Sequence, residues 1–169
     1  MNHPARWLLT LCAACGALLL YTGPGHTQTA PLEDLAQFPQ TTLTIGSGSA
    51  KHLFTIWVAD TPAREEQGLM FVRELPPDKG MVFSGPTPRV WTMWMKNTYI
   101  PLDMLFVAAD GRVIKIAHAI PHDESIISSE VAVGAVIELQ GGLSDRLHLK
   151  VGDIAKWKDV PAAAAAPAG

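Results

Sequence analysis

The fold class is decided by residues 102–120, which read LDMLFVAADGRVIKIAHAI. Within this stretch, two apolar runs, residues 102–108 and 112–120, flank the pair Asp110-Gly111. An Asp-Gly pair between such runs is a strong signal for a tight hairpin turn, because both residues tolerate positive φ. The stretch therefore predicts two antiparallel β-strands.

Further short runs with high β propensity lie on both sides of this hairpin. Residues 41–46 and 51–59 are joined by Gly46-Ser47-Gly48-Ser49 and predict a second hairpin. Phe83 is followed by a predicted Gly/Pro turn, and neither an internal repeat nor a βαβ spacing is present. The remaining strands are predicted at residues 81–83, 90–95, 131–139 and 153–157. We expect a mainly β, single-domain sandwich or barrel-like fold of about eight or nine short strands, with one or two short helices.

Helix signals are confined to two places. Thr61 is a good N-cap, Pro62 fits the first helical position, and Gly68 marks the end of a short helix. Gly141-Gly142 opens a second helical turn that extends toward Leu149.

The start of the chain has the composition of an export signal. Arg6 precedes an apolar run from Trp7 to Tyr21, and small and polar residues follow up to Ala30. This order is typical of a secretory signal peptide, and the run is shorter than the about 20 residues that span a bilayer. We expect residues 1–30 to be removed, leaving a periplasmic or secreted protein without stable membrane insertion. A retained anchor and a lipid on Cys15 are the alternatives.

The rest of the chain divides into three parts. Residues 31–40 are a predicted linker, residues 41–160 the β-domain, and residues 161–169 a disordered Ala/Pro tail. Both cysteines lie in the predicted signal, so the mature chain is expected to be cysteine-free, without disulfides or thiol nucleophiles. The formal net charge of the 169-residue chain is -3, which gives no support for a nucleic-acid partner.

The most unusual segment is residues 91–103, which read WTMWMKNTYIPLD. Because side chains alternate along a strand, this segment predicts one face with Trp91, Met93 and Met95 and another with Thr92, Trp94 and Lys96.

Several motifs in the chain resemble one known family. Trp94-Met95-Lys96-Asn97-Thr98, followed by Ile100-Pro101-Leu102-Asp103, resembles the signature of the domain of unknown function 192 (DUF192) family. One departure is Val72, where many members carry arginine, with Arg73 next to it. The resemblance implies a mainly β domain that is often exported, and it implies no settled reaction. Further matching motifs are Ala59-Asp60-Thr61-Pro62, Gly68-Leu69-Met70, Gly80-Met81-Val82-Phe83, Asp110-Gly111-Arg112-Val113, Val136-Ile137-Glu138-Leu139 with Gly141-Gly142, and Lys150-Val151-Gly152-Asp153.

The candidate ligand-binding residues come from the same segment. Lys96, Asn97 and Asp103 supply a cation, an amide and a carboxylate, which together can orient a small polar ligand. Trp94 can stack on a sugar or another flat ligand, or belong to the core. Arg64 is a candidate partner residue. The alternative is a structural network in which Lys96 pairs with Asp103 or Glu138.

Glu138 lies between apolar neighbours, so its pKa is expected to be raised unless Lys96 or Arg64 pairs with it. It is therefore either an acid/base group or one end of a buried salt bridge.

Two groups of residues, the methionines and the pair His118 and His122, contain possible metal ligands. We expect neither a metal nor a cofactor. Thioethers can bind copper(I), but methionine is also an ordinary core residue. Pro121 prevents the helix that would align His118 with His122. The methionines concerned are Met70, Met81, Met93, Met95 and Met104, and the acids beside the histidines are Asp123 and Glu124.

The favoured function is a binding module for a small polar ligand or an envelope protein, rather than an enzyme. The first alternative is a hydrolase or isomerase that uses Asp103 or Glu138 as general base, with Lys96 stabilising developing negative charge. The second alternative is a structural envelope protein without a pocket.

Overall fold

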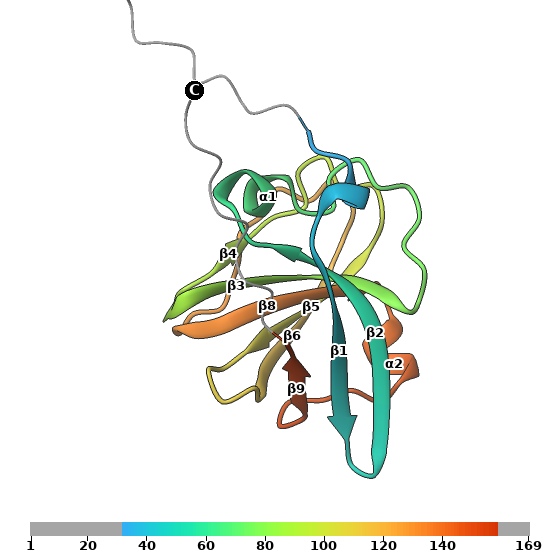
Figure 1. The fold of residues 1–169 in the computed structure, drawn as a ribbon, viewed down its shortest axis with the longest axis vertical. Coiled ribbons are helices and arrows are strands. Elements are labelled where there is room, and N and C mark those ends of the chain that lie inside the picture. Colours follow the sequence, from blue (N-terminus) through green and yellow to red (C-terminus); the bar gives the residue numbers. More distant parts are fainter. Residues whose placement is uncertain (1–31, 159–169) are drawn as a thin grey trace, which may run out of the picture.

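A computed structural model describes residues 32–158, and this part of the chain is mainly β (Figure 1). Nine strands form a curled, half-barrel-like arrangement with two short α-helices, which confirms the predicted fold class. The predicted signal, residues 1–30, and the predicted tail, residues 161–169, lie outside the described residues. The strands are β1 (Gln40–Ser47), β2 (Ala50–Ala59), β3 (Lys79–Arg89), β4 (Thr92–Met93), β5 (Leu102–Val107), β6 (Val113–Ala119), β7 (Ile127–Ser128), β8 (Val133–Gln140) and β9 (Ile154–Trp157). The helices are α1 (Pro62–Gln67), α2 (Leu143–Arg146) and a short 3-10 helix at Leu35–Gln37.

Seven of the strands belong to one sheet with the order β6-β5-β8-β3-β2-β1-β9, and β4 pairs with β7 in a separate two-stranded ribbon. The curl of the large sheet brings its two edges together. At that point an isolated bridge joins Arg112, just before β6, to Ile154 in β9. Within residues 32–158, no helix is long and apolar enough to cross a membrane.

The elements that local sequence signals predict are present in the structure. β1 and β2 form a hairpin in which Ser47 pairs with Ala50, and β5 and β6 flank Asp110-Gly111. The Thr61 side chain caps α1 by accepting a hydrogen bond from the Arg64 backbone N–H at 3.2 Å. The second predicted helical turn is shorter than expected and is α2.

Two expectations about connectivity are wrong. The sequence predicts no βαβ unit, but the structure contains one. In it, β2 and β3 pair in parallel across a connection that contains α1. The pattern is easy to miss because α1 fills only six residues of that connection. The predicted turn after Phe83 is also absent, since β3 continues through Pro86 and Pro88 to Arg89. Proline is tolerated there because β2 pairing ends at Phe83 and the β8 register is interrupted between Ser84 and Arg89.

The strand predicted at residues 90–95 is reduced to Thr92–Met93. Its partner, β7, is equally short and was not predicted. Phe38, which lies in the segment predicted as a linker, is only 3% exposed and packs in the core.

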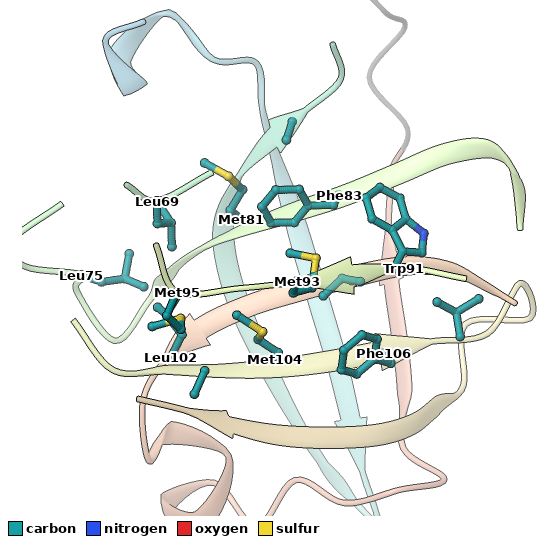
Figure 2. Packing of buried hydrophobic residues seen from close by; sticks show 14 of the residues in the cluster. Leu69, Leu75, Met81, Phe83, Trp91, Met93, Met95, Leu102, Met104 and Phe106 are labelled. Atoms are coloured by element: carbon teal, nitrogen blue, oxygen red, sulfur yellow. The ribbon is translucent and has the colours of Figure 1, made fainter. Parts of the chain in front are cut away.

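The large sheet is apolar on both faces, and each face has its own core. The inner core, which includes Leu43, Ile45 and Ile137, lies inside the curl and is covered at one end by Leu143 of α2. The outer core, which includes Phe83 and Met104, lies between the sheet and the segment that carries β4 (Figure 2). Figure 1 shows α1 and β4 on one side of the curled sheet and α2 on the other.

Candidate functional site

Residues 91–96 alternate between the core and solvent, as predicted. Trp91, Met93 and Met95 are buried, whereas Thr92, Trp94 and Lys96 are exposed. Trp94 is 40% exposed, so it is a surface residue rather than a member of the core.

Lys96 and Asn97 lie apart from the charged groups that were considered as their partners. The Lys96 ammonium lies 5.0 Å from the centroid of the Trp94 ring. Within residues 32–158, no ion pair joins Lys96 to Asp103 or Glu138. Asn97 occupies the left-handed region with φ 55°, and its carbonyl accepts a hydrogen bond from the Phe71 N–H at 2.9 Å. Its position in a turn agrees with the sequence prediction.

Asp103 is fully buried and organises one end of β5. Its Oδ2 accepts hydrogen bonds from both the N–H and the hydroxyl of Ser144 at 2.7 Å. Its Oδ1 accepts from the Gly142 N–H at 3.0 Å and pairs with His118 Nδ1 at 2.8 Å. This carboxylate therefore joins β5, β6 and the start of α2, which has no cap from its own N-cap side chain.

The hydrogen bonds of Asp103 set its protonation state and that of His118. Burial by itself would raise the pKa of Asp103, but the bonds from Ser144, His118 and Gly142 outweigh burial and lower the pKa below 3.8. The hydrogen bond to Asp103 raises the pKa of His118 above 6.5. The His118 side chain is 58% exposed, so its imidazole is accessible from solvent.

Arg64 lies at a different place from Glu138 and is held by two acids. Its guanidinium contacts Glu33 at 2.6 Å and Asp60 at 2.7 Å, and it covers the Phe38 ring. These contacts raise the pKa of Arg64, with the Glu33 hydrogen bond as the main cause. Oδ1 of Asp60 accepts the hydrogen bond from Arg64. Oδ2 of Asp60 is buried and has no hydrogen-bond partner among residues 32–158.

Glu138 is buried without a compensating charge. The residue is only 4% exposed. Within residues 32–158, its Oε2 has no hydrogen-bond partner and no ion pair includes it. Burial raises the pKa of Glu138 to about 8. The expectation of a raised pKa therefore applies, since neither Lys96 nor Arg64 pairs with this carboxyl.

A hollow of the described surface lies at the opposite end of β5 from Asp103. We call it the strand-end pocket, and its volume is about 790 Å³. Its walls come from the ends of β2, β3, β8 and β9 and from the turn between β5 and β6. Its polar lining residues are Asp60, Ser84, Asp110 and Lys156, and its apolar wall includes Val58, Pro86, Pro88, Ala155 and Trp157.

Sequence reasoning missed His118 and Ser144 as partners of Asp103, and it missed the strand-end pocket. The signal for His118 is present, because a hairpin that is symmetric about Asp110-Gly111 places residue 118 opposite residue 103, as observed. No comparable local signal exists for Ser144 or for the pocket, because both depend on the packing of segments far apart in the chain.

The described residues offer no conventional metal centre. Among residues 32–158, no group of three or more histidines, cysteines, aspartates and glutamates is close enough to hold a metal ion. His122 lies beside the Tyr99 ring, at 5.2 Å between ring centroids.

Comparisons with known proteins place the whole domain in context. The sequence profile of the DUF192 family, described as uncharacterized ACR, COG1430, matches residues 43–157. The chain is similar to a protein of known structure from Sinorhizobium meliloti 1021, described as a candidate transcription regulator, with 41% identity and a TM-score of 0.69 over 71% of this chain and 95% of that one. It is also similar to a protein of unknown function from Novosphingobium aromaticivorans DSM 12444, with 37% identity and a TM-score of 0.71 over 80% of this chain and 100% of that one. No curated protein matches the chain.

The Asp103 network leads to a prediction about stability. Asp103→Ala should lower the free energy of unfolding by roughly 3–5 kcal/mol at neutral pH, because buried donors on Ser144 and Gly142 lose their acceptor. His118→Ala should have a smaller effect that depends on pH. Denaturant unfolding of the variants and the unchanged chain between pH 4 and pH 9 measures both effects.

The sign of the pH dependence follows from the two shifts. A lowered Asp103 pKa stabilises the fold above pH 3.8, and a raised His118 pKa stabilises it below pH 6.5, with the latter contribution lost as the pH rises through the raised value. The effect of His118→Ala should therefore be largest between these values and shrink at alkaline pH. Glu66→Ala, which changes an exposed acid on α1 away from this network, is the control and should cost less than about 1 kcal/mol. An Asp103→Ala effect no larger than this control would contradict the structural role of the network.

Proposed function

The chain belongs to the DUF192 family, and we propose that it is an exported binding module that holds a small polar ligand in the strand-end pocket. The observation that carries this proposal is the pocket itself, with its apolar walls and its few polar side chains.

The size and lining of the pocket support a small-molecule ligand. Ligand sites commonly measure about 300–1,000 Å³ and combine apolar walls with a few polar groups. The strand-end pocket fits this description at about 790 Å³. Its walls are held in place by four strands and a hairpin turn, so the site is largely formed before a ligand arrives.

The accessible charges of the pocket fit a polar ligand. Asp110 contributes an exposed carboxylate and Lys156 an ammonium. Asp60, by contrast, is already paired with Arg64. The Asp110 side chain is 61% exposed, so a hydroxyl or ammonium group of a ligand can donate a hydrogen bond to its carboxylate. Trp157 offers an aromatic surface to the apolar side of such a ligand. Arg64 supports this wall indirectly, because it fixes Asp60 through Oδ1.

Export is proposed from the N-terminal sequence, and the periplasm or the extracellular space is the proposed location. A small ligand is favoured over nucleic acid, although the Sinorhizobium relative is described as a candidate transcription regulator. The formal net charge of -3 does not favour a phosphate backbone, which binds basic surfaces.

A hydrolase remains the alternative, and the Asp103–His118 pair favours it. Asp103 is a poor general base because its carboxylate is buried and accepts hydrogen bonds at both oxygens. It can instead orient His118, whose exposed imidazole would act as the base. The same contacts also cap α2, so they have a structural reason without any reaction.

Ligand retention tests the pocket. We expect native mass spectrometry of the protein purified from its own host to show a bound small molecule, and we expect Trp157→Ala or Lys156→Ala to lose it. Lys156 is exposed, so its replacement should leave the fold intact even if Trp157→Ala lowers the melting temperature.

Trp94→Ala is the matched control, since it removes a tryptophan outside the pocket. It should keep the ligand. Loss of the ligand in Trp94→Ala with retention in both pocket variants would contradict the pocket and favour the surface around Trp94, Lys96 and Asn97.

The intact mass of the mature protein tests export. The chain produced in a bacterial host with a working secretory system should appear in the periplasm or medium, cut between Gly23 and Ala30. Replacing Leu18, Leu19 and Leu20 with aspartate should block export, because the apolar run would be interrupted. A full-length, unprocessed chain in the cytoplasm would contradict this part of the proposal.

A further inference from the structure

The outer core contains a buried carboxyl group between two methionines. On β8, Glu138 pairs in register with Met81 of β3 on one side and with Met104 of β5 on the other. Residues that are directly opposite in neighbouring strands point to the same face, with Cβ atoms about 4.5–5.5 Å apart. The carboxyl of Glu138 and the two thioethers therefore lie on the same face of the sheet, and both methionines are fully buried.

Two more methionines reach this core from the covering segment. Met93 lies on β4 and Met95 follows it, and both belong to the same buried cluster as Met81 and Met104. Figure 2 shows the side chains of Met81, Met93, Met95 and Met104 among the residues of this one buried cluster. Four thioethers thus come from three separate parts of the chain to one apolar region.

Ordinary core packing explains the methionines but not the glutamate. Methionine fills irregular spaces in many cores. A carboxyl group in that environment is unfavourable unless it has a partner, and the Glu138 Oε2 has none within residues 32–158. An aliphatic residue would pack at this position without that cost, and the carboxyl group can ionise here only beside a positive charge.

We propose that Met81, Met93, Met95, Met104 and Glu138 form a binding site for a single copper(I) ion. The thioethers supply soft, neutral ligands, and the Glu138 carboxylate supplies the negative charge that balances the ion in an apolar surrounding. The site lies in the outer core and is separate from the strand-end pocket, so it does not depend on the proposed ligand function.

The donor set selects a soft monovalent ion. Calcium and magnesium need several oxygen ligands, and zinc needs nitrogen, thiolate or carboxylate ligands. Residues 32–158 contain no group of three or more such side chains near one another. Copper(I) is the common biological ion that binds thioethers.

The covering segment provides the way in. Met93 is 8% exposed, whereas Met81, Met95 and Met104 are fully buried. β4 pairs with β7 through only two residue pairs, and a ribbon of this size is weakly held on its own. Displacement of β4 would expose the thioethers without disturbing the large sheet.

Competition with a chromophoric copper(I) chelator under anaerobic conditions tests the proposal. The full chain should carry Cys12→Ser and Cys15→Ser in every arm, because free thiols bind copper(I) themselves. This parent should take up one copper(I) per chain, and Met81→Leu/Met104→Leu should lose the uptake. Leucine is close to methionine in volume, so the double variant should remain folded.

Met70→Leu is the matched control, because Met70 is a half-buried methionine outside the buried cluster, and it should bind like the parent. Glu138→Gln should weaken the affinity by about 10–100-fold, since the amide carries no charge. Absence of uptake by the parent, or unchanged uptake by the double variant, would overturn the proposal. X-ray absorption of the loaded parent gives an independent readout that does not depend on the variants, in which sulfur neighbours support the site and a shell of nitrogen alone contradicts it.

Discussion

The architecture depends on one constraint, which is that a single large sheet has to bury two apolar faces. Every residue of β5 is buried, and β8 is buried at six of its eight positions. Curling encloses the inner face, because it brings the sheet edges together at Arg112 and Ile154. The outer face cannot be enclosed in this way and needs a cover, which the chain supplies from the segment around β4 and from Leu69 and Leu75, which follow α1.

The enclosed inner face and the covered outer face of the sheet determine where the candidate sites lie. The strand-end pocket lies where the ends of strands from across the curled sheet meet, and the Asp103 network holds the other end of β5 against α2. Glu138 and the methionines lie between the sheet and its cover, where burial disfavours a charged group. The unusual composition of residues 91–103 thus has a structural reason, since one face of the segment covers the outer core and the other faces solvent.

Local patterns predicted much of this fold, and long-range packing set the limit. The hairpin at Asp110-Gly111, the Thr61 cap and the alternating burial of residues 91–96 each follow from neighbours in sequence. The parallel pairing of β2 and β3 does not, because it depends on how a long connection packs. Asp103 was a candidate site residue, and its partner His118 could have been found by counting residues from the Asp110-Gly111 turn. The strand-end pocket could not, because its walls come from segments that meet only in the folded chain.

Native-state hydrogen exchange tests the central claim that β4 and β7 form a separable cover over a stable curled sheet. The amides of Met93 and Ser129 should exchange through local opening, at a lower free energy than the amides of Leu105 in β5 and Ile137 in β8, which should require global unfolding. Equal protection of both groups at all denaturant concentrations would mean that cover and sheet unfold as one unit, and it would contradict the account.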